Sequence, residues 1–200
     1  MEKNLVPQSY KISRKERRER NKHNSLMIFL TGLSGSGKST IANAVEQLLF
    51  EKGFNTYVLD GDNIRRGINK NLSFSPEDRS ENIRRIAEIG KLFVDAGVVV
   101  LAAFVAPYEQ DREYIKETVG KEHYTEVFVN TSLDVCEKRD VKGLYKKARL
   151  GEIKNMTGIS APYEAPKNPD VIVNEKNTVE EAASIIFATI KDKLILENNE

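Results

Sequence analysis

Residues 32–39 read GLSGSGKS, and this stretch decides the fold of the chain. It fits the pattern G-x-x-x-x-G-K-[S/T], follows the apolar run SLMIFLT (25–31) and precedes a helical stretch at 38–52. That order of strand, loop and helix is the context the pattern requires. The glycines let backbone N–H groups curl around phosphate oxygens, and the helix N-terminus adds positive partial charge toward the same anion. The sequence therefore predicts a nucleotide phosphate site, with ATP as the expected nucleotide.

Individual residues of this phosphate loop (residues 32–39) have distinct expected roles. Lys38 should reach the β- and γ-phosphates, and the hydroxyl of Ser39 should bind Mg²⁺, whose other ligands would include phosphate oxygens and water. A Gly/Ser turn without a nucleotide is the alternative, and the flanking strand and helix argue against it. The expected nucleotide contacts are Gly32, Ser34, Gly35, Ser36, Gly37, Lys38, Ser39 and Thr40.

Apolar runs and amphipathic stretches alternate along the rest of the chain. Continuous apolar runs indicate strands covered on both faces, and alternation with helices indicates a parallel sheet. The predicted fold class is therefore α/β, with three layers in which a parallel five-stranded sheet is flanked by helices. Besides 25–31, strands are expected at 55–60, 98–104, 124–130 and 170–174, and besides 38–52, helices are expected at 76–96, 108–118, 132–138 and 178–195.

Length and composition fit one soluble domain. The chain has 200 residues, and 31 basic against 30 acidic residues leave a formal charge of +1, so no global field attracts nucleic acid or a membrane. No apolar run approaches the roughly 20 residues of a membrane span, so a cytoplasmic location is expected. The single cysteine, Cys136, excludes an intramolecular disulfide and a multi-cysteine metal site, and it is expected to be a small buried helix residue.

Two segments depart from the alternation. Residues 1–24 contain the basic run KISRKERRERNKHN, which lacks apolar periodicity, so we expect a mobile or loosely docked arm ahead of a domain at 25–200. Residues 140–168 have no strand pattern, and their length with their Gly and Pro content indicates a functional lid or binding loop, with the lid at about 140–165.

A cluster of charges follows the second strand, where residues 60–67 read DGDNIRRG. Ligands bind outside the carboxyl ends of strands in open α/β sheets, so this cluster should lie beside the phosphate loop. We expect Gly61 to let the chain turn so that Asp60 and Asp62 both face the cleft. One carboxylate would serve the metal and the other the attacking hydroxyl, as catalytic groups with Lys38, and Asp60 is taken as a metal ligand with Ser39.

The arginines after these acids suit an anionic acceptor. Arg65 and Arg66 can bind an anion through planar forks, although one of the two is expected to be a surface residue. The alternative role for Asp60 is to cap a helix.

The next helix begins at Ser75, an expected N-cap before Pro76 at the first helical position. Arg79 and Asn82 are three residues apart on one face near that N-terminus, which indicates a second anion site. Phe74, directly before the cap, is either a hydrophobic staple or a flat face for a base, and the sequence does not decide between these roles.

Three stretches closely resemble the adenylylsulphate kinase (APS kinase) family over about residues 25–175. They are DGDNIRRGINKNLSFSPEDRSENIRR (60–85), FVAPY (104–108) and CEKRDVKGLYKKARLGEIKNMTGI (136–159). The resemblance implies a P-loop kinase fold and Mg-ATP-dependent phosphorylation of the 3′-hydroxyl of adenosine 5′-phosphosulfate (APS) to give PAPS and ADP, the second step of sulfate assimilation. It also implies that the lid covers the nucleotides. The substrate contacts it implies are Asp62, Asn63, Arg65, Phe74, Arg79, Asn82, Val105, Ala106, Lys142, Leu144, Met156 and Thr157.

The chain departs from the family pattern at two of these positions. Ala106 stands where the family has a serine reported as a phosphorylation site. Met156 stands where the family has an aromatic residue that stacks on the substrate adenine opposite the counterpart of Phe74. A thioether can cover a ring face, although less rigidly than an aromatic ring does.

Other functions are compatible with parts of this pattern. The same loop and carboxylates would suit a small kinase for a sugar acid or a nucleoside monophosphate. A binding module that uses the basic arm on nucleic acid is a non-enzymatic alternative, which the lack of interleaved aromatic residues in the arm disfavours. The expected partners are therefore ATP and APS, without nucleic acid or membrane. The sequence does not set the oligomeric state, and a homodimer is one option.

Overall fold

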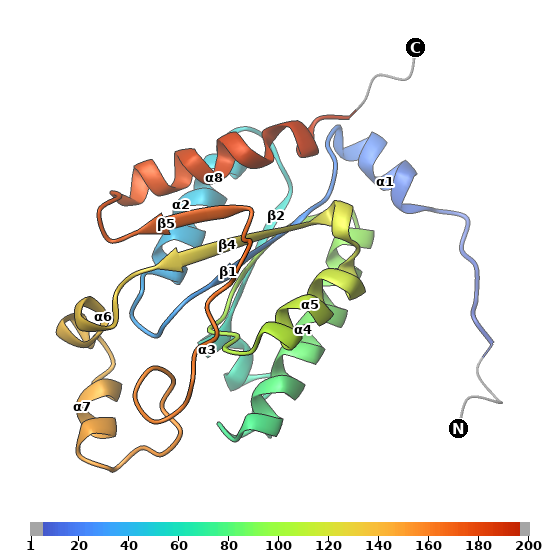
Figure 1. Cartoon of the computed structure of the whole chain (residues 1–200). Coiled ribbons are helices and arrows are strands. Elements are labelled where there is room, and N and C mark those ends of the chain that lie inside the picture. Colours follow the sequence, from blue (N-terminus) through green and yellow to red (C-terminus); the bar gives the residue numbers. More distant parts are fainter. Residues whose placement is uncertain (1–5, 197–200) are drawn as a thin grey trace.

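The computed structural model describes residues 6–196 and has a five-stranded parallel sheet at its centre (Figure 1). The strand order is β2-β3-β1-β4-β5, and every neighbouring pair is parallel. The sequence prediction of this sheet is confirmed, with each strand end within two residues of its expected position. The strands are β1 (Met27–Thr31), β2 (Thr56–Asp60), β3 (Val99–Ala103), β4 (Tyr124–Asn130) and β5 (Val171–Asn174).

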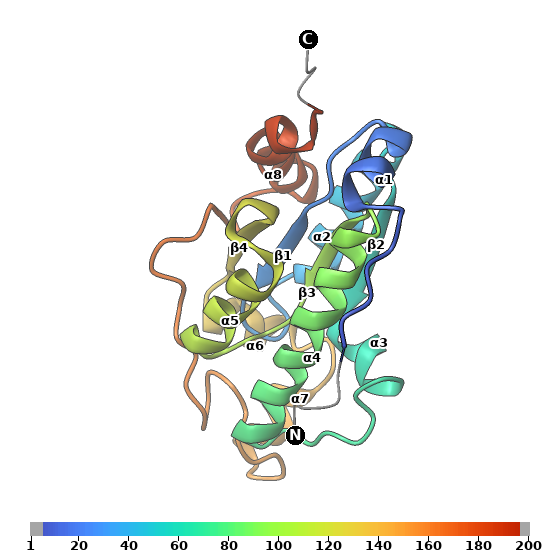
Figure 2. The same cartoon turned by 90° about the vertical axis from the view of Figure 1, so that its right-hand side faces the viewer.

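Helices cover both faces of the sheet and make the three layers (Figures 1 and 2). One face carries α2 (Lys38–Glu51) and α8 (Val179–Leu194), which pack on each other, and the other carries α4 (Pro76–Asp95) and α5 (Glu109–Val119). All of β1 is buried because apolar side chains of both layers meet it. Burial of apolar surface stabilises a fold by about 25 cal/mol per Å². The two apolar clusters therefore stabilise the sheet, and with it the sheet edge that carries the site.

Short helices lie at the carboxyl edge of the sheet. α3 (Gly61–Arg66) follows β2 directly, and α6 (Leu133–Arg139) and α7 (Leu144–Arg149) follow β4. A 3₁₀ turn at Lys121–His123 precedes β4. α3 was not expected from the sequence, because it has only six residues, GDNIRR, and these show no apolar periodicity.

The basic arm contains one helix that the sequence analysis also missed, α1 (Arg14–Asn21). Its signal is a capping box, in which Ser13 and Glu16 bond reciprocally to each other's backbone. α1 buries no side chain, but Asn21 donates to the carbonyl of Gly97 at 2.9 Å and Arg18 donates to Ser25 at 3.2 Å. The end of α1 is thus hydrogen-bonded to the domain, whereas residues 6–13 are exposed.

The segment expected to form a lid has its own small apolar cluster. Cys136 on α6, Tyr145 on α7 and Met156 are buried together, which confirms the prediction of a buried helical cysteine. The Tyr145 hydroxyl donates to the carbonyl of Ser34 in the phosphate loop at 2.8 Å. The segment therefore packs against the loop rather than projecting from the domain. Within residues 6–196, no helix combines the length and the apolar character needed to cross a membrane.

Candidate active site

A cavity of about 740 Å³ opens at the carboxyl edge of the sheet. Its walls come from the phosphate loop, from the start of α3, from the first turns of α4, and from the loop after β3. The segment 139–157 and the turn after β5 complete it. Segments far apart in the sequence therefore meet here, where a parallel sheet with helices on both faces is expected to bind its ligands.

The phosphate loop has the backbone geometry of an anion cradle. Gly35 and Gly37 adopt positive φ angles of 75° and 104°, which side chains other than glycine rarely adopt. Gly32 has a different reason to be glycine, because a Cβ atom there would lie 2.5 Å from the carbonyl oxygen of Val129. All of the loop residues predicted to contact nucleotide line the cavity except Gly32, which lies beneath it against β4.

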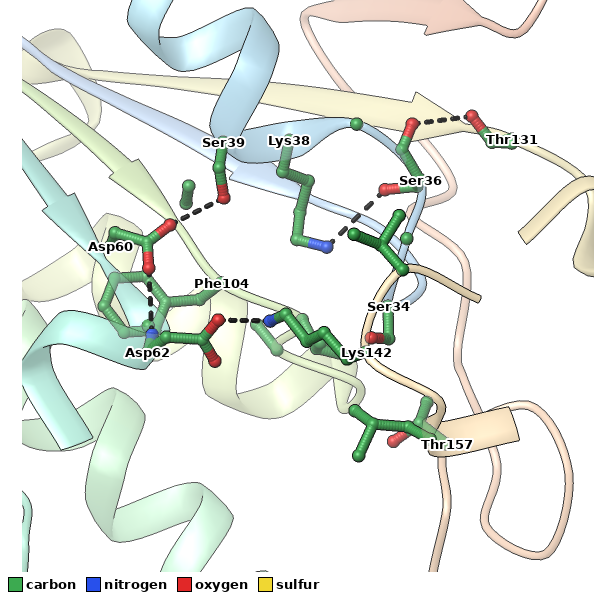
Figure 3. Close-up of a pocket in the computed structure, with 18 of the residues that line it drawn as sticks. Ser34, Ser36, Lys38, Ser39, Asp60, Asp62, Phe104, Thr131, Lys142 and Thr157 are labelled. Atoms are coloured by element: carbon green, nitrogen blue, oxygen red, sulfur yellow. Dashed lines mark hydrogen bonds and ion pairs between the residues drawn. The ribbon is translucent and has the colours of Figure 1, made fainter. Parts of the chain in front are cut away.

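Lys38 is buried inside the loop, with only 8% of its surface exposed. Its ammonium donates to the carbonyls of Gly32 at 3.0 Å and Leu33 at 2.8 Å. It also points to the Ser36 hydroxyl, 3.5 Å away (Figure 3). The pKa of Lys38 is lowered to about 8, mainly by burial, and the nearby positive charge of Lys142 contributes to this lowering. A poorly solvated cation held at a phosphate cradle is a strong electrostatic partner for an anion, since little water screens it.

Ser39 and Asp60 offer the oxygen ligands that Mg²⁺ prefers. The Ser39 hydroxyl donates to Asp60 Oδ2 at 2.6 Å, so the two oxygens are close enough to bind one ion (Figure 3). Mg²⁺ is commonly held by one or two protein groups, together with phosphates and water, rather than by an all-protein cage. These residues therefore fit the ion predicted from the sequence.

Asp60 lies beside the phosphate loop, as expected. β3 separates β2 from β1, and Asp60 reaches the loop through Ser39 at the start of α2. The role expected for Gly61 is wrong. Gly61 has no positive φ angle, so it is not needed for a turn; its missing side chain instead leaves room for Phe104, whose ring would lie 3.3 Å from a Cβ atom. The Oδ1 atom of Asp60 caps α3 by accepting from the Asp62 amide, so the capping role coexists with the metal geometry.

Asp62 faces the cavity and bonds to Lys142 from the opposite wall (Figure 3). This contact joins α3 to the segment after α6, across the opening of the cavity. Both side chains are more than half exposed, so the pair contributes little to stability by itself. Asn63, in contrast, is exposed on α3 and is not among the residues that line the cavity.

Two arginines and Phe74 form a cationic wall. The guanidinium of Arg65 lies 4.4 Å from the Phe74 ring centre, and that of Arg79 lies 5.6 Å from it. Burial lowers the pKa of both arginines, which start so high that both remain cations. Arg66 is exposed and does not line the cavity, which confirms that one arginine of the pair is a surface residue.

The structure favours one of the two roles left open for Phe74. A hydrophobic staple needs an apolar partner four positions into the helix, and that position holds Arg79. The ring is 59% exposed and lines the cavity, so it offers a flat face to a bound molecule. The predicted cap of α4 is confirmed, because Ser75 accepts from the amide of Asp78 and Pro76 opens the helix.

Arg79 also holds the segment that closes the cavity. It donates to the Thr157 hydroxyl at 3.1 Å and to the carbonyl of Asn155 at 2.8 Å. The side chains of Met156 and Leu144 line the same wall. Met156 is only 7% exposed and packs against Cys136 and Tyr145, so part of it belongs to the apolar cluster rather than to the cavity surface.

The loop after β3 closes the floor of the cavity with Val105 and Ala106. Ala106 has a φ angle of 41°, in the left-handed region that costs a residue with a side chain roughly 1 kcal/mol or more. Its carbonyl accepts from the buried Arg112 at 2.8 Å, and Arg112 also donates to the carbonyl of Glu164 at 2.7 Å. The strained conformation is thus fixed by a side chain that the sequence analysis did not single out.

Arg139 lines the cavity and was not expected there from the sequence. It follows β4 on α6, and its guanidinium donates to the Gly35 carbonyl at 3.3 Å. Its one sequence signal was its position in a basic stretch after a strand, which also describes many surface residues. Only the packing of α6 against the phosphate loop identifies it.

Comparisons with known proteins agree with this geometry. The model of the adenylylsulphate kinase family matches residues 24–174. The adenylyl-sulfate kinase of Oceanobacillus iheyensis is 52% identical over 191 residues, which are 95% of this chain and 96% of that protein. The adenylyl-sulfate kinase of Staphylococcus carnosus is 52% identical over 194 residues, 96% of this chain and 98% of that protein.

Among solved structures, the APS kinase of Mycobacterium tuberculosis in complex with AMPPNP and APS is 43% identical, with a TM-score of 0.82. The match covers 84% of this chain and 98% of that one. A family model that spans most of the chain, near full-length relatives and a shared fold lead to one conclusion: the chain belongs to the adenylylsulphate kinase family.

Proposed function

We propose that this chain transfers the γ-phosphoryl group of Mg-ATP to the 3′-hydroxyl of APS, giving PAPS and ADP. The observation that carries the proposal is a single cavity that joins a phosphate loop, two carboxylates and a cationic aromatic wall. An enzyme of this family needs these three parts together, because phosphoryl transfer depends on positioning and on charge neutralisation. Near full-length relatives named adenylyl-sulfate kinase support the choice of acceptor.

The donor half of the cavity is assigned to the phosphate loop. Its backbone amides would cradle the phosphates of ATP, and Lys38 would neutralise charge on the transferring group. Ser39 and Asp60 would hold Mg²⁺, which supplies further charge neutralisation when it is bound. Asp60 is the better metal partner of the two carboxylates, because it already contacts Ser39.

The acceptor half is assigned to the opposite wall. Arg65 and Arg79 would bind the phosphosulfate group as cations that burial has partly desolvated. Phe74 would stack on the adenine of APS. Asp62 faces the centre of the cavity and would orient the attacking hydroxyl and accept its proton.

Lys142 links the two walls through its contact with Asp62. We propose that residues 140–165 act as a lid that moves when this contact exchanges for contacts to the substrates, with Tyr145 as its anchor on the phosphate loop. Asn63, which is exposed outside the cavity, would touch substrate only after such a movement. A homodimer is also proposed, but no residue of the site requires a second copy of the chain.

The decisive experiment measures ADP release and product formation with APS, gluconate and AMP in parallel, with and without Mg²⁺. The expected result is Mg²⁺-dependent formation of PAPS with APS and background release with the other two acceptors. A sugar-acid or nucleotide kinase would instead turn over gluconate or AMP, and would refute the proposed acceptor. The Lys38→Ala variant serves as the negative control, because it keeps the cavity but lacks the ammonium.

A further inference from the structure

Asn82 places a neutral amide on the face of α4 that, with Arg79, borders the cavity. It is 5% exposed and lines the cavity one helical turn after Arg79. An asparagine side chain can present either a donor, its NH₂ group, or an acceptor, its carbonyl oxygen, and the two orientations have almost the same shape. The NH₂ group would attract an anionic substrate and the carbonyl oxygen would repel it, so the orientation of this amide matters for binding.

A chain of hydrogen bonds fixes that orientation, and it begins at Arg85. The Arg85 guanidinium donates to Glu81 at 2.8 Å, to the carbonyl of Ile68 at 3.2 Å and to the side chain of Asn71 at 2.9 Å. It also donates to Oδ1 of Asn69 at 3.1 Å. A guanidinium has donors only, so the atom of Asn69 that faces Arg85 must be the oxygen.

Asn69 passes this polarity on to Asn82. It is fully buried, and with its oxygen toward Arg85 its NH₂ group faces Asn82 and donates to Oδ1 at 2.9 Å. The Asn82 oxygen is then taken, which leaves its NH₂ group turned away from Asn69. Within residues 6–196 that NH₂ group makes no hydrogen bond to protein, and Asn82 borders the cavity, so the free donor is available to a bound molecule.

We propose that Asn69 is a positioning residue, which holds the Asn82 amide with its NH₂ group toward the acceptor substrate. The proposal rests on the proposed function, because it takes the molecule beside α4 to be the anion APS. Asn69 itself is buried behind Asn82 and does not line the cavity, so it acts only through the amide that it orients. Arg85, which Glu81 and the loop 68–71 hold in place, determines which end of each amide in this series of hydrogen bonds donates and which accepts.

The substitution Asn69→Asp tests this series of hydrogen bonds, because it reverses the direction of the bond between residues 69 and 82 while the side chain keeps nearly the same shape. The new carboxylate still accepts from Arg85, but it cannot donate to Asn82. The Asn82 NH₂ group therefore turns inward to that carboxylate, and its carbonyl oxygen turns toward the substrate. We expect the KM for APS to rise about tenfold or more, since an acceptor replaces a donor beside an anion. The KM for ATP should change less than about twofold, because the donor site lies on the other wall.

Asn71→Asp is the matched control. Asn71 is exposed and accepts from the same guanidinium, so this variant adds the same charge at the same arginine without touching Asn82. Its KM for APS should match that of the unmodified protein. In the background of Asn82→Ala, Asn69→Asp should add no further effect on APS, because the amide that it reorients is gone. Equal effects of Asn69→Asp and Asn71→Asp, or an undiminished effect in the Asn82→Ala background, would overturn the proposal.

A measurement on the unmodified protein without substrate separates this proposal from the proposed function. In ¹⁵N-labelled protein the side-chain NH₂ protons of Asn69 should exchange slowly with water, and those of Asn82 should exchange fast and shift on addition of APS. Slow exchange of the Asn82 protons together with fast exchange of the Asn69 protons would refute the proposed orientation of the two amides, even if every variant failed to fold. Absent turnover of APS by the unmodified protein would refute the proposed function, and the exchange rates would still decide the orientation of Asn82.

Discussion

The buried ammonium of Lys38 predicts how the enzyme depends on pH. Burial lowers the pKa of Lys38 to about 8, so about nine-tenths of the side chain is charged at pH 7 and about one-tenth at pH 9. Only the charged form can neutralise a transferring phosphoryl group. We therefore expect kcat/KM for ATP to be nearly constant up to about pH 7, to fall to about half near pH 8, and to approach a tenfold loss per pH unit above about pH 9.

The sign follows from which form burial disfavours. Burial disfavours the charged lysine, so the free protein loses the proton at lower pH than an exposed lysine does. Bound ATP adds negative charge beside the ammonium and raises its pKa again. Since kcat/KM reports the free enzyme and kcat the complex, kcat should fall at a higher pH than kcat/KM for ATP does.

Steady-state rates from pH 6.5 to 9.5, at saturating APS and Mg²⁺, measure the alkaline limb, that is the fall at high pH, of both kcat/KM for ATP and kcat. The second ionisation of a phosphate, near pH 6, is nearly complete across most of this range and does not produce the alkaline limb. Lys38→Arg is the control, because its residual activity should lack the limb below pH 9.5. Lys142→Ala should move the limb to higher pH, since the neighbouring cation lowers the pKa of Lys38. A flat kcat/KM for ATP up to pH 9.5 in the unmodified protein would refute the reasoning.

Three further outcomes are expected. Arg79→Ala should cost about 2 to 5 kcal/mol in kcat/KM for APS, because it removes a desolvated cation and the bond to Thr157, and kinetics showing an equal loss for ATP would contradict the assignment of this wall. Tyr145→Phe should destabilise the protein by about 1 kcal/mol through the lost bond to Ser34, measured as a lower Tm, and an unchanged Tm would show that this bond is not an anchor. Ala106 has no nucleophile, so transfer should be a single displacement that inverts configuration at phosphorus. Chirally labelled ATP measures this, and retention in PAPS would contradict it.

The sequence by itself determined the layers of the fold and the donor half of the site. Strands buried on both faces have continuous apolar runs, and helices have a 3.6-residue period, so all five strands and the long helices could be placed from local patterns. The phosphate loop is equally local, since its glycines act through the backbone, and Lys38 and Ser39 through their side chains, within one continuous turn. The cap at Ser75 follows from the same short-range chemistry.

Only the tertiary structure decided which side chains face one another across the cavity. The strand order inserts β3 between β1 and β2, so the contact of Ser39 with Asp60 depends on the packing of α2 and not on neighbouring strands. Arg139 and Asn69 could not be assigned from the sequence, because an arginine on a short helix and an asparagine in a loop are ordinary surface residues until a partner far along the chain is placed beside them. Hydrogen-bond polarity is a property of such an assembled network, and no local pattern of residues encodes it.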